Sequence, residues 1–271
     1  MHGLTSLRLI LPSMLLVCLP ARDVLLAQRF PPFTSGEGMV VCAEPRAAAA
    51  GFEVLRAGGN AADAAVAVGF ALAVTYPSAG NLGGGGFIIY REPFGLVHAL
   101  DYREAAPLRA RRDMFLDSQG HPQEKLSRRS LLASGVPGSV DGMLATLERF
   151  GSGRFRLGEL IAPALRLAER GFPVSHVFRD GLEGSRELFA PWSSSMALFF
   201  PGGMPFPAGD TLRQGDLARV LREIARNGRE GFYSGWVADS LVSFMDREGG
   251  LISHEDLARY RCVKRDPVVF D

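Results

Sequence analysis

The chain has 271 residues, of which 47% are apolar and 22% are charged, and its formal net charge is +1. This length suits one large domain or two small ones, and the composition excludes a disordered, coiled-coil or collagen-like chain. A balance of 30 basic and 29 acidic residues lacks the positive excess that duplex nucleic acid requires, so no nucleic-acid partner is expected.

The first 27 residues have the pattern of a secretory signal peptide. After a weakly basic start, residues 9–19 form an apolar run too short to span a bilayer, and Ala21 or Ala27 offers a small residue for cleavage. We therefore expect an exported protein, periplasmic or secreted, with a retained membrane anchor as the alternative. A proline-rich linker follows at residues 28–37.

A short apolar strand is expected at residues 39–43, followed by two helices. Pro45 can open the first helix, because the first turn does not need its missing N–H. Asn60 caps the second helix, and Asp63 favours the positive helix start. This second helix is apolar on nearly all sides and ends at Pro77, which predicts that it is buried and closely packed.

Four consecutive glycines separate the second helix from a predicted β-hairpin: Gly83, Gly84, Gly85 and Gly86. The hairpin strands are expected at residues 87–91 and 96–103, and the short turn between them predicts antiparallel pairing. A dinucleotide fingerprint lies after a strand and before a helix, whereas this run follows a helix and precedes a strand. A Walker loop needs a lysine, and none is nearby, so both kinds of nucleotide site are excluded. What remains is backbone that comes close to another group, or a tight helix-to-strand crossover.

Five further helices are expected downstream, at residues 139–149, 157–169, 214–226, 235–247 and 254–259. Proline- and glycine-rich loops separate them; one contains the serines at 193–195, which are interpreted as a polar loop. A last strand is predicted at 261–270. The order of elements predicts an α+β fold, in which helices are layered on an antiparallel sheet.

Most sequence patterns for catalysis are absent. The five histidines are scattered and no metal-ligand spacing is present, so no metal or cofactor is expected. Ser139 lacks the glycine spacing of a nucleophile elbow. Outside the signal peptide only Cys42 and Cys262 remain, which either pair in an oxidising compartment or are small buried apolar residues.

One segment, DYREAAP at residues 101–107, carries a candidate binding group. It places Asp101 and Arg103 on one face, at the end of the second hairpin strand. An arginine there can form a forked, charge-assisted hydrogen bond with a substrate carboxylate. The alternative is an internal pair between Arg103 and either Asp101 or Glu104.

The strings AGGNAADAAVAVGFALAVTYPSAGNLGGGGF, DYREAAP and RDMFLD resemble the N-terminal part of the γ-glutamyltranspeptidase (glutathione hydrolase) family. Further matches follow in the family's order: GVPGSVDGM, ELIAPALRLAERGFPVS, QGDLARVLREIARNGREGFYSG and GGLISHEDLARYRCVKRDPV. Together they cover residues 38–271, which is far more specific than a single glycine-rich loop.

This resemblance implies an N-terminal-nucleophile hydrolase with an αββα sandwich, made as a precursor that cuts itself into a large and a small subunit. The small subunit's N-terminal threonine attacks the γ-glutamyl amide of glutathione or another donor, with its own amine as base. The acyl group then passes to water, an amino acid or a peptide. By the same resemblance Arg103 matches the arginine that binds the α-carboxylate of the γ-glutamyl group, and the glycine run has a structural role near that pocket.

The family's threonine lies in a T-T-H-like setting, which fits none of the five threonines here: Thr5, Thr34, Thr75, Thr146 and Thr211. We therefore expect residues 38–271 to be a C-terminally truncated large subunit, an incomplete αββα sandwich with no catalytic residue in this chain and no activity alone. Without its small subunit it should expose a hydrophobic sheet edge. The alternative is a short non-catalytic carboxylate-binding remnant, or the partner of a separately encoded small subunit.

Overall fold

The computed structural model describes residues 34–270; the predicted signal peptide and most of the linker lie outside this range. The chain divides into two compact units, Met1–Glu37 and Gly38–Asp271. The fold described below is that of the second unit. Among the described residues, no helix combines the length and the apolar character needed to cross a membrane.

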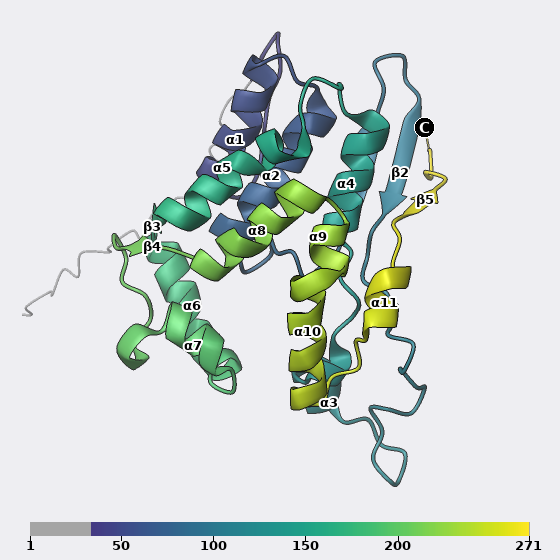
Figure 1. Ribbon diagram of the computed structural model, residues 1–271, viewed down its shortest axis with the longest axis vertical. Helices are drawn as coiled ribbons and strands as arrows, with labels where there is room; N and C mark the ends of the chain where they lie inside the picture. The colour runs from purple at the N-terminus through teal and green to yellow at the C-terminus, as the bar shows by residue number, and fades with distance from the viewer. Residues whose placement is uncertain (1–33, 271) are drawn as a thin grey trace, which may run out of the picture. The chain divides into compact units, whose positions relative to one another are not determined.

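The second unit mixes helices and sheet, as the sequence predicted (Figure 1). The helices are α1 (Pro45–Arg56), α2 (Ala61–Thr75), α3 (Glu124–Arg129), α4 (Ser139–Phe150), α5 (Leu157–Arg170), α6 (His176–Phe189), α7 (Ser193–Phe199), α8 (Gly215–Asn227), α9 (Glu230–Tyr233), α10 (Gly235–Glu248) and α11 (His254–Arg259). The strands are β1 (Phe87–Arg91), β2 (Val97–Asp101), β3 (Phe172–Pro173), β4 (Thr211–Leu212) and β5 (Val263–Arg265).

The two predicted N-terminal helices are confirmed. Glu44 caps α1 by accepting the backbone N–H of Arg46 at 2.8 Å, and Pro45 follows as the first helical residue. Asn60 and Asp63 form a capping box at the start of α2, in which each side chain accepts the other's backbone N–H. This pairing satisfies two donors that a helix start leaves unpartnered. Helix α2 packs against α1, α4 and α5.

The predicted hairpin forms two strands of a three-stranded sheet with the order β1-β2-β5, in which β2 is the central strand. Strand β1 pairs antiparallel with β2, from Phe87 opposite Asp101 to Arg91 opposite Val97. Strand β5 pairs antiparallel with the other edge of β2. Helix α4 contacts both β1 and β2, so the layered arrangement of helices on an antiparallel sheet is confirmed (Figure 1).

The downstream helices are confirmed to within one residue at each end, as α4, α5, α8, α10 and α11. Helix α5 packs between α2 and α8, and its Leu160 and Ile161 are fully buried. Burial of such side chains is the main stabilising term of the helical layer.

Three predicted strands are wrong in part or in full. The second hairpin strand is Val97–Asp101 instead of 96–103. Residues 39–43 form no strand, and Val41 is 82% exposed, because no neighbouring strand among the described residues pairs with this segment. Strand β5 ends at Arg265 instead of continuing to 270. Pro267 follows shortly afterwards, and its lack of an N–H disfavours a longer ladder.

The serines at 193–195 do not form a loop: they are the first turn of α7. Helix α6 was also missed, because Gly181 and Gly184 lower the helix propensity of its sequence. Helices α3 and α9 are too short for a periodic pattern to reveal them.

Candidate functional site

The glycine run brings the chain close to the end of the hairpin. A Cβ on Gly85 would lie 2.5 Å from the carbonyl oxygen of Tyr102 and 2.9 Å from the Cα of Arg103. On the other side, the carbonyl oxygen of Gly84 accepts the N–H groups of Gly138 and Ser139, at 2.8 and 2.9 Å. The run is therefore held between the backbone around Arg103 and the start of α4.

The four glycines are not equally constrained. A Cβ on Gly84 would meet the side chain of Asn81 at 2.6 Å, and one on Gly86 would meet the ring of Tyr102 at 3.0 Å. At Gly83 the nearest atom would be 3.9 Å away, so this position has room for a side chain. The close approach inferred from the sequence is tightest at Gly85, directly under Arg103.

Arg103 lies two residues beyond the end of β2, with its side chain 62% exposed. Its Nε lies 3.2 Å from Oε2 of Glu104, and its guanidinium lies over the ring of Phe87, 5.9 Å from the centroid. One of the internal pairs considered above, that with Glu104, is therefore present. Because it uses Nε alone, the Nη1 and Nη2 edge has no partner among the described residues and remains open to a ligand.

Asp101 does not compete for that edge. It forms an ion pair with Arg265, whose Nη2 lies 2.9 Å from its Oδ2, and its Oδ1 accepts the backbone N–H of Arg103 at 3.0 Å. The hydrogen bond from the Arg103 N–H lowers the pKa of Asp101, and Arg265 acts in the same direction. Asp101 therefore stays ionised and holds the main chain of Arg103.

A cavity of about 420 Å³ opens beside Arg103. Its lining contains more arginines than carboxylates. The four arginines are Arg103, Arg259, Arg261 and Arg265, and the three carboxylates are Asp101, Glu104 and Asp256. Asp256 is already used, since it accepts the N–H of Leu108 at 2.7 Å and that of Ser253 at 2.8 Å. A small anion therefore suits this cavity, with the open guanidinium edge of Arg103 as its partner.

Another cavity, of about 460 Å³, lies between α2, β1 and the segment at residues 39–41. Its lining includes Val66, Leu72, Ile88 and Met143 and no charged side chain. It offers no charged anchor for a carboxylate. A third cavity, of about 450 Å³, has charged side chains, among them Asp141, Glu148 and Arg149, but does not include Arg103. The cavity beside Arg103 is therefore the candidate site.

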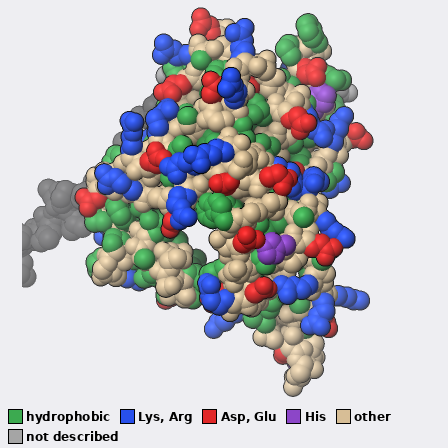
Figure 2. Space-filling view, in the orientation of Figure 1, with side chains coloured by type: hydrophobic (Ala, Val, Ile, Leu, Met, Phe, Trp, Pro, Cys, Tyr) green, Lys and Arg blue, Asp and Glu red, His purple; other side chains and the backbone are tan. Residues whose placement is uncertain are grey.

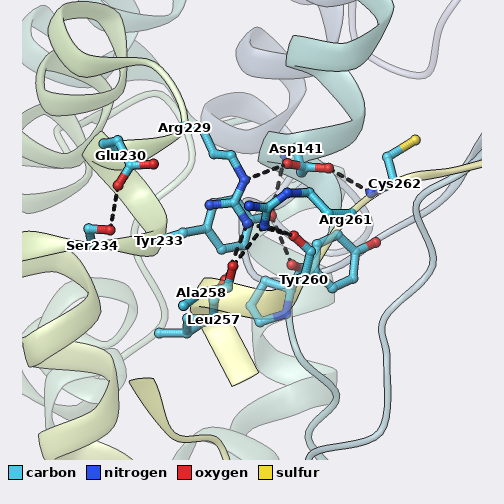
Figure 3. A network of polar contacts seen from close by, with 11 residues as sticks. Asp141, Arg229, Glu230, Tyr233, Ser234, Leu257, Ala258, Tyr260, Arg261 and Cys262 are labelled. Carbon is cyan, nitrogen blue, oxygen red and sulfur yellow. Dashed lines mark hydrogen bonds and ion pairs between the residues drawn. The ribbon is translucent and has the colours of Figure 1, made fainter. Parts of the chain in front are cut away.

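A network of polar contacts joins three separate parts of the chain (Figure 3), and two of its residues, Tyr260 and Arg261, line that cavity. Asp141, in the first turn of α4, accepts Arg229 Nε at 2.9 Å through Oδ1 and the Cys262 N–H at 2.6 Å through Oδ2. Arg229 also donates to the carbonyl oxygen of Tyr260 at 2.5 Å and lies over the ring of Tyr233, 4.4 Å from its centroid. Helices α4, α9 and α11 are thereby tied to β5.

Among the residues that the structure describes, no group of three or more metal-ligand side chains is found. His98 is partly buried, and its Nε2 lies 2.7 Å from Oε1 of Glu92, so it has a polar partner and is not an unpartnered candidate ligand. Cys42 and Cys262 are free and half-buried, not paired. Burial raises the pKa of the Cys262 thiol to about 11, so it is not a thiolate nucleophile at neutral pH.

The threonines within the fold are engaged in secondary structure. Thr75 and Thr146 are buried and donate to helix carbonyls four residues earlier, at 3.0 and 2.7 Å. Thr211 lies in the short strand β4. Thr75 and Thr146 are therefore not exposed nucleophiles, and neither they nor Thr211 line the cavity beside Arg103.

Sequence reasoning selected Arg103 as a candidate, and it gave no role to Asp141, Arg229 or Tyr260. The hydrogen bonds that link these three residues to one another and to Arg103 join positions 31 to 157 residues apart, which no local pattern reveals. The glycines of the string GVPGSVDGM were an available signal. A Cβ on Gly138 would lie 2.1 Å from the Tyr260 hydroxyl, and one on Gly142 2.2 Å from Cγ of Tyr102.

Charged side chains of both signs alternate over the face shown in Figure 2, and no patch of one sign dominates it. This surface agrees with the balanced composition of the chain. The concentration of arginines is local, at the cavity beside Arg103.

Comparison with known proteins gives consistent matches. The family model described as Gamma-glutamyltranspeptidase matches residues 47–271. A glutathione hydrolase proenzyme of Escherichia coli K12 is 46% identical over 244 residues, which are 89% of this chain and 42% of that relative. The chain thus spans about two fifths of the length of the curated relatives it matches.

Solved structures agree with this result. The γ-glutamyltranspeptidase of Helicobacter pylori superposes with a TM-score of 0.86 at 45% identity, over 89% of this chain and 69% of that one. The γ-glutamyltranspeptidase of Pseudomonas nitroreducens, complexed with L-DON, gives a TM-score of 0.80 at 39% identity, over 86% and 68% of the two chains.

Proposed function

The chain belongs to the γ-glutamyltranspeptidase family, and we propose that it forms the donor-binding part of an enzyme that transfers or hydrolyses γ-glutamyl groups. Its donors would be glutathione and other γ-glutamyl amides, and its acceptors water, amino acids or peptides. The observation that carries this proposal is the open guanidinium edge of Arg103 in an arginine-lined cavity.

In this proposal Arg103 binds the α-carboxylate of the γ-glutamyl group. A guanidinium presents two parallel N–H donors that match a carboxylate, and Nη1 and Nη2 have no partner within residues 34–270. The pairing of Nε with Glu104 orients the side chain without blocking that edge. Gly83, Gly84, Gly85 and Gly86 keep the structural role assigned to them from the sequence.

The nucleophile would come from a segment outside these residues, an N-terminal threonine exposed by self-cleavage of a precursor. Its hydroxyl would attack the γ-glutamyl carbonyl, its amine would take the proton, and the donor's amine would leave. Water or an amino acid would then release the γ-glutamyl group from the threonine. The relatives' designation as proenzymes supports this view.

The sheet offers a surface for such a segment. Strand β1 is an edge strand of the described sheet, and its Phe87 and Ile89 are 61% and 66% exposed. Beyond β5, Val268 and Phe270 are each 87% exposed. Apolar side chains along an unpaired edge are the surface that a further strand or subunit covers. We propose that the small subunit covers these exposed apolar side chains at the edges of the sheet.

Export to the periplasm or the cell exterior is also proposed, on the pattern of residues 1–27 alone. N-terminal sequencing of the protein recovered from culture medium or periplasm checks it. A mature chain beginning near Gln28 supports export, and an intact Met1 in the cytoplasm contradicts it.

Replacing Arg103 by alanine in the full-length gene product is expected to raise the donor KM about 10- to 100-fold, as a lost hydrogen bond to a charged group predicts. Arg103→Lys should have an intermediate effect, because it keeps the charge and loses the fork. Steady-state kinetics with a γ-glutamyl anilide measure both. Arg179→Ala, an exposed arginine of α6, is the control. An unchanged donor KM in Arg103→Ala removes the carboxylate assignment.

Purified residues 28–271 are expected to release no chromogenic amine from a γ-glutamyl anilide, because no described residue supplies the nucleophile. The full-length gene product is the positive control. Measurable turnover by residues 28–271 would contradict this prediction.

The DNA after codon 271 separates the enzyme from a non-catalytic carboxylate-binding protein. A reading frame that continues, directly or after a frameshift, to a threonine-led segment supports the enzyme. A stop codon with no such segment supports the non-catalytic protein or a separately encoded partner.

A further inference from the structure

We infer that Tyr260 is a positioning residue, which fixes the main chain of Arg103 so that its guanidinium meets the donor carboxylate. This inference rests on the function proposed above. Its basis is one long-range contact: the Tyr260 hydroxyl donates to the carbonyl oxygen of Arg103 at 2.8 Å, across 157 residues of sequence.

The backbone of Arg103 depends on side chains for its hydrogen bonds. The sheet contacts of this segment end at Tyr102, which bonds to Gly86, and resume at Ala105, which bonds to Val136. Between these points the Arg103 N–H donates to Asp101 and its carbonyl accepts from Tyr260. No strand within residues 34–270 bonds to the main chain of Arg103, so Asp101 and Tyr260 hold it in place.

Tyr260 is itself rigidly held. Its side chain is 6% exposed, and its ring stacks on that of Tyr233, with centroids 5.9 Å apart and planes inclined by 1°. Its carbonyl oxygen accepts from Arg229, which the ion pair with Asp141 holds in turn. Figure 3 shows Arg229 and Asp141 pointing toward each other beside Tyr260. The hydroxyl is therefore supported from behind the cavity.

The approach of Tyr260 to Arg103 requires Gly138. A Cβ there would lie 2.1 Å from the Tyr260 hydroxyl and 2.0 Å from the Tyr102 carbonyl oxygen. Burial raises the pKa of Tyr260 above its usual value, so the hydroxyl remains a donor at neutral pH. The start of α4 thus provides the space in which the tyrosine reaches the backbone next to the donor site.

The test is a double-mutant cycle in the full-length gene product, with Tyr260→Phe, Arg103→Ala and the double variant. Phenylalanine keeps the stacked ring and removes only the hydroxyl. Loss of one hydrogen bond predicts a rise in donor KM of about three- to tenfold with kcat and acceptor KM unchanged. In the Arg103→Ala background the same substitution should change donor KM no further.

Tyr90→Phe is the matched control, since the Tyr90 ring stacks on Phe150 at 4.6 Å and, in the described part of the chain, its hydroxyl makes no hydrogen bond to Arg103. Its donor KM should stay at the wild-type value. Thermal unfolding of all variants checks that the kinetic change does not follow stability alone.

The outcomes separate the two claims. An unchanged donor KM in Arg103→Ala refutes the carboxylate site of the proposed function. If Arg103→Ala raises donor KM while Tyr260→Phe leaves it unchanged, only the positioning role fails. If the two effects multiply in the double variant, Tyr260 acts independently of Arg103, and the inference is overturned.

Discussion

Replacement of Asp141 by alanine is expected to lower the free energy of unfolding by about 3–5 kcal/mol, because removing one member of a buried ion pair leaves the other charge uncompensated. The side chains of Asp141 and Arg229 are 10% and 20% exposed. Asp141 also accepts the Cys262 N–H at 2.6 Å, so its loss releases the start of β5 from α4 as well. Urea unfolding of the full-length gene product measures the change.

Asp216→Ala is the matched control for this prediction. Asp216 faces Arg219 at 3.4 Å on α8, but the two side chains are 99% and 63% exposed. Solvent and salt screen such a pair, so its loss should cost less than about 1 kcal/mol. Equal losses for Asp141→Ala and Asp216→Ala would show that the buried pair carries no special weight.

The double variant Asp141→Ala with Arg229→Met is expected to recover part of the stability. An apolar side chain removes the uncompensated charge, and buried pairs replaced as a whole often cost little. Recovery should be incomplete, because Arg229 also donates to the carbonyl oxygens of Leu257 and Tyr260. Those acceptors would lose their partner.

The parts of the fold that the sequence predicted well are those specified by local chemistry. Asn60 and Asp63 satisfy the first N–H groups of α2 whatever the rest of the chain does. The turn at Pro93–Gly95 brings two apolar strands together over a short loop, where antiparallel pairing is the geometry available. Such signals lie within a few residues of the element they define.

Elements that depend on distant partners were predicted poorly. Residues 39–43 are apolar enough for a strand, but a strand also needs a neighbouring strand with which to pair. The described residues provide no such partner for this segment. The serines at 193–195 favour a turn in isolation, yet they begin α7, whose Phe199 is buried against Phe189. Tertiary packing outweighed the local preference in both cases.

The candidate site divides in the same way. Arg103 was accessible to sequence reasoning, because its place at a strand end and the family resemblance indicate the same residue. Tyr260 was not accessible to sequence reasoning. It directly follows the predicted helix of residues 254–259, and that prediction does not indicate which distant residue its side chain contacts. The ion pair of Asp141 with Arg229 spans 88 positions, so only the folded chain reveals it.

Gly142→Ala is expected to destabilise the protein by about 2–3 kcal/mol, although alanine usually favours a helix over glycine by about 1 kcal/mol. The added Cβ would lie 2.2 Å from Cγ and 2.6 Å from Cβ of Tyr102. These atoms lie close to the backbone of Tyr102. The N–H and the carbonyl oxygen of that residue both form hydrogen bonds with Gly86, so the backbone cannot easily move. Relief therefore requires moving the chain directly before Arg103.

Gly181→Ala is the same substitution, but it is expected to change the free energy of unfolding in the opposite direction. Gly181 is an exposed residue inside α6, and nothing lies within 4 Å of an added Cβ. Its replacement should raise the free energy of unfolding by about 0.5–1 kcal/mol, through the reduced entropy of the unfolded chain. Urea unfolding of the two variants, with donor KM measured beside it, tests the pair. A Gly142→Ala protein as stable as Gly181→Ala would mean that Tyr102 does not pack on α4, and the close support of Arg103 from that helix would have to be abandoned.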